Sequence, residues 1–258
     1  MIETLTVNNL AYGYFEENVI ENINIRAEAG KFTGIIGSNG SGKSTILKCI
    51  YGALKPQKGE ILLGNKRLSD MKPQQLASNL AVVGQENEFT FDFTVWEMAA
   101  MGRNPHKGLF QPDTAEDRKI VADALKKTGT YDLKDRSFRQ LSGGEKQRVI
   151  IARAIAQQTE LMILDEPTNH LDIAYQLQTF ETVKALGVTV LAAMHDLNLA
   201  ALFCDRIYVL KGKQVFAAGG PEEILTPDNI RKVFGVEAEM RASRKTGKPI
   251  VSYIPDIY

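Results

Sequence analysis

The sequence has few cysteines and histidines, the residues that form disulfides in small folds or bind structural metals. Among its 258 residues are two cysteines and three histidines. Cys49 and Cys204 lie far apart and outside any CxxC pair, so we expect reduced thiols in a cytosolic protein rather than a disulfide framework. The histidines are equally dispersed, which predicts that the chain has no structural zinc site.

An excess of charge and a long apolar run are also missing. Lys+Arg and Asp+Glu both number 31, which argues against non-specific nucleic-acid binding while leaving room for a local basic patch. No apolar run approaches the ~20 residues that a membrane helix needs. The first four residues lack the charged start and apolar stretch of a secretory leader, so we expect none. The composition, 44% hydrophobic and 24% charged, predicts a globular chain with a buried core.

Hydrophobic patterning divides the chain into strand-like and helix-like regions. Alternating apolar residues, such as Leu5 and Val7, predict strands with one wet face. The wholly apolar runs 161–164 and 188–192 predict parallel strands covered on both faces. Residues 207–210 and 215–218 predict a hairpin.

Capping-box spacing marks three helix starts in the middle of the chain. The pairs are Thr94 with Glu97, Thr114 with Asp117, and Ser142 with Glu145. We therefore predict one domain with an α/β core and a helical insert. The expected ranges are 1–86 and 158–235 for the core, 87–157 for the insert and 236–258 for a C-terminal tail.

A glycine-rich segment follows the predicted strand 32–36 and precedes a predicted helix. Residues 37–44 fit GxxxxGK[ST] in the strand–loop–helix context that this motif requires. The glycines let backbone N–H groups point inward, Lys43 adds a full positive charge, and the Ser44 hydroxyl suits Mg²⁺. An ordinary glycine-rich turn is the alternative. We predict that ATP phosphates are bound by Gly37, Ser38, Asn39, Gly40, Ser41, Gly42, Lys43, Ser44 and Thr45.

Two carboxylates follow the buried run 161–164. In open α/β sheets, ligands bind beyond the carboxyl ends of the strands. Asp165 therefore suits Mg²⁺, directly or through a water, and Glu166 suits the polarisation of an attacking water. The alternative is a plain acidic turn, which the phosphate motif elsewhere in the chain disfavours.

The segment 141–148, Leu-Ser-Gly-Gly-Glu-Lys-Gln-Arg, resembles the signature motif of the ATP-binding cassette (ABC) ATPases. That family usually has Gln where this chain has Glu145, and Glu is a tolerated variant there. A capped helix start with two glycines is an exposed anion site. The resemblance covers nearly the whole chain. It implies a P-loop NTPase core with N-terminal antiparallel β elements and an inserted helical subdomain, and that Ser142, Gly143 and Gly144 bind the γ-phosphate of ATP held by the other subunit.

Other positions match family motifs in the same order. Gln85 is similar to the Q-loop glutamine, which reaches Mg²⁺ and water, and Asp172 to the D-loop aspartate at the dimer contact. His195 matches the switch histidine that contacts the γ-phosphate. Tyr14 matches the aromatic residue that stacks on adenine, with Tyr12 as the competing choice.

Each motif occurs once, which has a consequence for assembly. If the signature completes a site on another chain, one copy cannot close a site but two copies close two. The resemblance therefore implies a head-to-tail, ATP-dependent homodimer. It further implies a peripheral position on the cytoplasmic face of the membrane, permease partners, an indirect substrate-binding protein and no nucleic acid.

Finer features suggest which transporter the chain serves. Residues 101–105, 114–117 and 221–227 resemble importers of iron chelates, haem and cobalamin, although manganese and zinc importers have related ATPases. Non-transport ABC proteins of DNA repair or translation usually have coiled-coil insertions or two cassettes, and this chain has neither. A nucleotide-sensing switch is the third reading, which an apparently complete catalytic set weakens.

An aromatic stretch follows Gln85. Because aromatic anchors are favoured at interfaces, we expect this stretch to help form a groove for a cytoplasmic helix of the membrane subunit. Packing within the core of the insert is the alternative. The stretch comprises Phe89, Phe91, Phe93 and Trp96.

Overall fold

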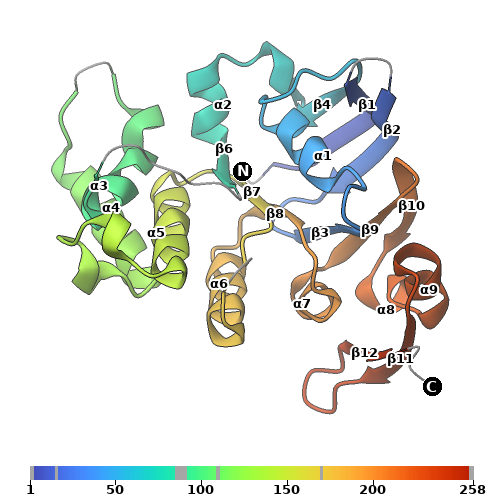
Figure 1. Ribbon diagram of the computed structural model, residues 1–258. Helices are drawn as coiled ribbons and strands as arrows, with labels where there is room; N and C mark the ends of the chain where they lie inside the picture. The colour runs from blue at the N-terminus through green and yellow to red at the C-terminus, as the bar shows by residue number, and fades with distance from the viewer. Residues whose placement is uncertain (1–2, 15–16, 85–91, 109–110, 169–170, 256–258) are drawn as a thin grey trace. The chain divides into compact units, whose positions relative to one another are not determined.

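The computed structural model describes residues 3–14, 17–84, 92–108, 111–168 and 171–255 (Figure 1). The chain forms two compact units, each with its own strands and helices. Unit 1 comprises Met1–Asp70 and Thr189–Tyr258, and unit 2 comprises Met71–Val188.

An antiparallel sheet in unit 1 has the strand order β2-β1-β4-β5. Val7 pairs with Ile25 across β1 and β2, and both side chains are buried, as the alternation predicted. The N-terminal antiparallel elements are thus confirmed. The strands are β1 (Leu5–Tyr14), β2 (Glu17–Ala27), β4 (Lys58–Leu63) and β5 (Lys66–Arg67).

A second set of strands in unit 1 has the order β10-β9-β3-β8. Strand β3 runs parallel to both β8 and β9, whereas β10 forms the predicted antiparallel hairpin with β9. Every residue of β3 and β8 is buried, which explains why both strands are mostly apolar, each with a single threonine, Thr33 or Thr189. The strands are β3 (Phe32–Gly37), β8 (Thr189–Ala193), β9 (Arg206–Lys211) and β10 (Gln214–Gly219).

Short helices and a C-terminal hairpin complete unit 1. Asn198 on α7 joins the hairpin, because its Oδ1 accepts the Val251 N–H at 2.7 Å and its Nδ2 donates to the Val251 carbonyl at 3.2 Å. The elements are α1 (Lys43–Ile50), η1 (Leu68–Asp70), α7 (Leu197–Phe203), α8 (Pro221–Ile224), α9 (Pro227–Phe234), β11 (Glu237–Ala242) and β12 (Pro249–Ile254).

Unit 2 is mainly helical, with two parallel strands in which Val83 pairs with Leu164. It includes the helices expected of the insert. Its elements are α2 (Pro73–Asn79), β6 (Leu80–Val83), α3 (Val95–Ala100), η2 (Met101–His106), α4 (Ala115–Lys127), η3 (Tyr131–Leu133), η4 (Phe138–Gln140), α5 (Gly143–Ala156), β7 (Leu161–Asp165) and α6 (Ile173–Ala185).

The three predicted capping boxes are all present. They open α3, α4 and α5, each one residue after the predicted Thr or Ser cap. In α3, Glu97 Oε2 accepts the Thr94 N–H at 2.8 Å, and Thr94 Oγ1 accepts the Glu97 N–H at 3.2 Å. These bonds satisfy N–H groups that a helix start otherwise leaves without partners.

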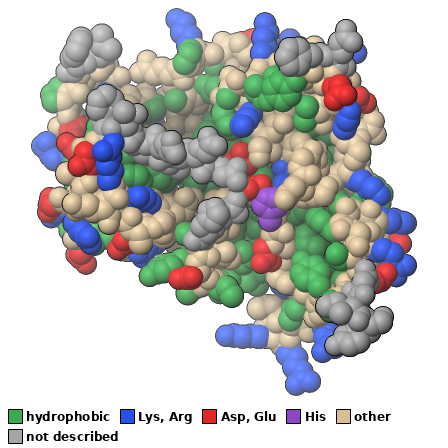
Figure 2. Space-filling view, in the orientation of Figure 1, with side chains coloured by type: hydrophobic (Ala, Val, Ile, Leu, Met, Phe, Trp, Pro, Cys, Tyr) green, Lys and Arg blue, Asp and Glu red, His purple; other side chains and the backbone are tan. Residues whose placement is uncertain are grey.

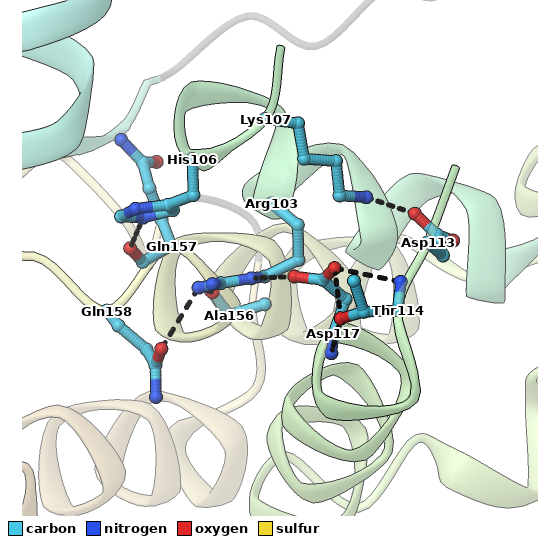
Figure 3. Close-up of polar contacts among 9 residues, drawn as sticks. All are labelled: Arg103, His106, Lys107, Asp113, Thr114, Asp117, Ala156, Gln157 and Gln158. Carbon is cyan, nitrogen blue, oxygen red and sulfur yellow. Dashed lines mark hydrogen bonds and ion pairs between the residues drawn. The ribbon is translucent and has the colours of Figure 1, made fainter. Parts of the chain in front are cut away.

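A buried polar cluster joins three elements of unit 2 (Figure 3). The Arg103 guanidinium on η2 pairs with Asp117 Oδ1 on α4 at 2.9 Å. It also donates to the Ala156 carbonyl at 2.8 Å and to Gln158 Oε1 at 3.0 Å, beyond the end of α5. Arg103 and Asp117 are only 8% and 7% exposed. The segment 101–105, which resembles chelate importers, therefore also holds the end of α5.

The state of the two cysteines and the distribution of surface charge are consistent with the sequence. Cys49 and Cys204 are free, buried thiols. Acidic and basic side chains are interspersed over the face shown in Figure 2. Because neither sign dominates that face, the equal numbers of charges are also mixed in space rather than segregated there.

Candidate functional site

The phosphate loop (residues 37–45) joins β3 to α1 in unit 1, as predicted. Gly42 caps the helix with φ 100°, a conformation that side-chain-bearing residues rarely adopt. A Cβ added there would lie 2.4 Å from Ile20 Cγ2. The loop therefore requires glycine at this position for two independent reasons.

Polar groups of the loop are arranged to receive an anion. Lys43 is 4% exposed, and its Nζ donates to the carbonyls of Gly37 at 2.9 Å and Ser38 at 3.2 Å. The Ser41 hydroxyl is buried without a hydrogen-bond partner in the described part of the chain. A Cβ at Gly40 would meet nothing within 4 Å. A buried ammonium, an unsatisfied hydroxyl and open space beside the backbone fit the oxygens of a phosphate.

His195 emerges at the same edge of the sheet as the phosphate loop. Strands β3 and β8 are parallel, Ile35 pairs with Ala193, and the Met194 N–H donates to the Ile35 carbonyl at 3.0 Å. The exposed His195 comes one residue later. Asp196 then caps α7, accepting the N–H groups of Asn198 and Leu199 at 2.7 and 3.0 Å. The strand register thus brings together two motifs about 150 residues apart in sequence.

The two candidate adenine-stacking residues lie in different environments at the end of β1. Tyr14 is 49% exposed, and Tyr12 is less exposed than Tyr14. The two rings meet edge-on, with a centroid distance of 5.2 Å. Desolvation, followed by the neighbouring Tyr14, raises the pKa of Tyr12. Tyr14 therefore has the freer ring face, and Tyr12 supports it from the side.

The acidic pair lies at the end of β7 in unit 2. Asp165 is the last strand residue and is 4% exposed. Glu166 has φ 52°, a strained conformation for a non-glycine residue that is common at functional sites. Gln85 lies outside the described residues, but β6 ends at Val83, which is beside Leu164. Sequence patterns alone did not predict the positive φ at Glu166.

The signature segment (residues 141–148) opens α5, a helix of 14 residues. Ser142 caps the helix: its Oγ accepts the Glu145 N–H at 3.3 Å. Glu145 Oε2 accepts both the N–H and the hydroxyl of Ser142 at 2.8 Å. These Ser142 hydrogen bonds lower the pKa of Glu145. Gly143 is exposed, and a Cβ there would meet nothing within 4 Å, so the helix start is open to a ligand.

Tyr175 on α6 contacts the signature segment, a contact that the sequence did not predict. The Arg148 guanidinium lies 4.7 Å from the centroid of the Tyr175 ring. A methyl group added at Gly144 would lie 3.6 Å from the same ring. An aromatic residue three positions after Asp172 was the available signal, but nothing local indicates which way its ring points.

The first turn of α6 also holds the segment before it. Asp172 is the N-cap residue of α6, although its side chain makes no capping bond. Gln176 Nε2 donates to the carbonyls of Thr168 at 3.3 Å and Leu171 at 3.0 Å. Consecutive residues of α6 therefore contact the signature segment and the D-loop-like segment.

The expected site residues are divided between the two units. Unit 1 contains Tyr14, residues 37–45 and His195, and unit 2 contains Ser142, Gly143, Gly144, Asp165, Glu166 and Asp172. The phosphate loop of unit 1 presents positive and polar groups that suit phosphate. Unit 2 contributes two adjacent carboxylates at a strand end and, elsewhere, an exposed helix N-terminus, and residues of these types are used in the cleavage of phosphoanhydrides.

A family model described as ABC transporter matches residues 20–169, more than half of the chain. The chain belongs to this family. The resemblance inferred from the signature segment is confirmed, as is the ABC ATPase fold. The chain is an ATP-binding component of the kind that couples ATP hydrolysis to transport, and such components work with membrane permeases.

Comparison with individual proteins agrees with this assignment. The chain is 38% identical to the iron(3+)-hydroxamate import ATP-binding protein FhuC of Bacillus subtilis, covering 96% of this chain and 94% of that protein. It is also 38% identical to the uncharacterized ABC transporter ATP-binding protein YvrA of the same organism, but spans only 58% of that protein's length. A solved metal-chelate type ABC transporter in an inward-facing conformation superimposes with a TM-score of 0.85 and 27% identity, covering 99% of this chain and 98% of that one.

No helix in the described part of the chain is both long enough and apolar enough to cross a bilayer.

Proposed function

We propose that two copies of this chain bind and hydrolyse ATP at shared sites and thereby power a membrane importer of metal chelates. The main support is that each chain has one phosphate loop with a buried Lys43 and one open, capped helix start at Ser142. If the phosphate loop of each chain faces the Ser142 helix start of the other chain, two copies complete two sites.

The phosphate loop would hold the ATP phosphates in each chain. Its backbone N–H groups, the Lys43 ammonium and the Ser41 hydroxyl supply donors and positive charge to the phosphate oxygens. Tyr14 would stack on the adenine ring. Mg²⁺ fits the oxygen-bearing side chains of Ser44, Asp165 and Gln85, and when bound it would neutralise charge on the terminal phosphates.

Hydrolysis would depend on carboxylate and imidazole side chains that follow buried strands. Glu166 would accept a proton from the attacking water, and the strained backbone at this residue would fix the direction of its carboxylate. His195 would contact the γ-phosphate from the edge of the sheet that also bears the phosphate loop. Gln85 would orient the water and sense the membrane subunit.

The second copy would complete each site. Ser142, Gly143 and Gly144 would meet the γ-phosphate on the partner's phosphate loop, and Asp172 would lie at the contact between the two chains. Closure of this head-to-tail homodimer would then depend on ATP, and hydrolysis would release it.

The assembly would sit peripherally on the cytoplasmic face of the membrane. Its partners would be permease subunits and, indirectly, a substrate-binding protein. FhuC is named for iron(3+)-hydroxamate import, and the neighbouring solved structure is a metal-chelate type transporter. We therefore infer an iron-siderophore, haem or cobalamin cargo. Uptake of manganese or zinc instead of a chelate would contradict the cargo assignment but not the ATPase assignment.

The catalytic assignment is tested by the Glu166→Gln variant. We expect turnover to fall by ~10²–10⁴ because the general base is lost. ATP affinity should remain within a few-fold, since the phosphate loop is intact, and ATP-bound dimers should accumulate. Phosphate release, nucleotide titration and size-exclusion chromatography measure these three effects.

Glu181→Gln is the matched control, because Glu181 is an exposed acid on α6. It should hydrolyse ATP at the wild-type rate. Wild-type turnover in Glu166→Gln would remove Glu166 from the mechanism. Full ATP binding without dimers in that variant would contradict the shared site.

A further inference from the structure

Glu145 lies in the signature segment, and its carboxylate contacts the N-cap residue of the helix that this segment opens. Its Oε2 accepts the Ser142 N–H and the Ser142 hydroxyl, both at 2.8 Å. The Ser142 Oγ in turn accepts the Glu145 N–H at 3.3 Å. Within a single chain, the donor groups of Ser142 therefore already have an anionic partner.

The charge of this carboxylate is retained near neutral pH. Hydrogen bonds from the Ser142 backbone and side chain lower the pKa of Glu145, and the nearby Arg136 and Arg148 act in the same direction. The field at the N-terminus of a helix also favours a negative group. The same field attracts a phosphate, so Glu145 and a phosphate compete for the N–H and hydroxyl donors of Ser142.

A second capping box of unit 2, at the start of α3, shows that an acid at this position can be a simple cap. At α3, Glu97 makes the corresponding bonds to Thr94, at 2.8 Å to the N–H and 2.9 Å to the hydroxyl. Hydrogen bonds from Thr94 likewise lower the pKa of Glu97. The two boxes thus share their local geometry and differ in place, since only the one at Ser142 lies within the signature segment.

We propose that Glu145 is an internal competitor of phosphate at the signature segment. In the separate chain its carboxylate holds the Ser142 donors, and on closure it repels the γ-phosphate of the partner's ATP. Glu145 therefore weakens the ATP-dependent dimerisation of two chains. This inference rests on the proposed function, in which the signature segment meets ATP on a second copy.

Replacing Glu145 by Gln distinguishes the effect of its negative charge from the effect of its capping hydrogen bonds. Gln can still accept the Ser142 N–H, so the capping box survives while the negative charge is lost. Two like charges a few ångströms apart repel each other even at a protein surface, where the effective dielectric is lower than in water. Removal of one charge should therefore strengthen ATP-driven association by about tenfold or more.

The experiment compares three full-length proteins that all contain Glu166→Gln, so that ATP is not consumed. They are the parent, the parent with Glu145→Gln, and the parent with Glu97→Gln as the matched control. Sedimentation velocity over a range of protein concentrations gives the dimer dissociation constant in saturating MgATP. Titration of the separated chains at low protein concentration gives their ATP affinity.

We expect Glu145→Gln to lower the dimer dissociation constant by about tenfold or more, since each dimer would contain two such sites. Its effect should shrink in high salt, which screens exposed charges. The Glu97→Gln control and the ATP affinity of the separated chains should stay within twofold of the parent.

Unchanged or weaker dimers with Glu145→Gln, beside a parent that dimerises normally, would overturn the role of Glu145 alone. An equal gain in the Glu97→Gln control would overturn it too, because the gain would then be unspecific. If no protein dimerises in MgATP, the shared site itself is overturned and the inference falls with it.

Discussion

At the residue scale, Gly42 shows how two constraints meet at one position. Its φ of 100° excludes most side chains, and Ile20 fills the space that a Cβ would need. Gly212 in the β9–β10 turn also has a positive φ, 57°, but a Cβ there would meet nothing within 4 Å. A comparison of the two positions therefore distinguishes the effect of backbone strain, which both share, from the effect of steric overlap, which only Gly42 has.

We predict that Gly42→Ala weakens ATP binding by at least about tenfold, because the phosphate loop must shift to relieve the overlap with Ile20. Gly212→Ala should leave ATP affinity unchanged and cost about 1–2 kcal/mol of unfolding free energy, the cost of a left-handed conformation. Titration with a fluorescent ATP analogue and urea unfolding measure both. Normal ATP affinity in Gly42→Ala would show that the loop tolerates a displaced α1 start.

At the element scale, the Arg103 cluster fixes the end of the signature helix. Arg103 reaches the carbonyl of Ala156, and Gln157 Nε2 donates to the Leu80 carbonyl at 2.9 Å. The segment η2 is therefore bonded to α4 and α5, while the end of α5 is bonded to β6. Asp117 is the only acid that the described structure pairs with the buried Arg103, so loss of its charge leaves a buried cation.

We predict that Asp117→Asn lowers the unfolding free energy of unit 2 by about 3 kcal/mol at pH 7, because a buried ion pair loses one partner. Hydrogen bonds from Thr114, then the Arg103 ion pair, hold the pKa of Asp117 far below its ordinary value. A depressed folded-state pKa gives stability that is fully present above about pH 4 and is lost as pH falls below it. The difference between wild type and variant should therefore narrow below about pH 4.

Urea unfolding followed by tryptophan fluorescence measures this effect, since Trp96, the single tryptophan, lies in unit 2. Asp123→Asn is the control: Asp123 is exposed on the same helix, and its loss should change stability by no more than about 0.5 kcal/mol. A pH-independent difference for Asp117→Asn would contradict the ion-pair explanation.

At the scale of the whole molecule, transport requires that hydrolysis act on a membrane partner. The aromatic stretch after Gln85 remains our predicted contact with that partner. Phe93 and Trp96 are half-buried, whereas Phe89 and Phe91 lie outside the described residues. The few residues that dominate an interface are enriched in Trp and Tyr, and each costs at least about 2 kcal/mol when truncated to alanine.

We predict that Trp96→Ala uncouples hydrolysis from transport. ATP binding and hydrolysis by the purified chain should persist, while uptake by the reconstituted transporter should fall by about tenfold or more, because an interface anchor is lost. Tyr253→Ala is the control, since Tyr253 is a 54% exposed aromatic residue of unit 1 on the C-terminal hairpin. Unchanged uptake in Trp96→Ala would assign this ring to packing within unit 2.

The sequence by itself determined the features that depend on short spacing. The phosphate loop is recognisable because its donors lie within nine consecutive residues, and the capping boxes because each joins residues three apart. Apolar runs of four and five residues, 161–164 and 188–192, likewise predicted the buried parallel strands. Family membership followed from these local motifs and from the signature segment.

Only the tertiary structure decided how distant segments meet. Arg103 and Ala156 are 53 residues apart, and the Tyr175 ring beneath Arg148 belongs to another helix. Such contacts depend on how elements pack, which local propensity does not encode. The strained backbone of Glu166 has the same origin, since surrounding packing must offset its cost. The spacing of Ser142 and Glu145 predicted a cap, whereas the folded chain shows that this cap places a carboxylate on the donors expected to bind phosphate.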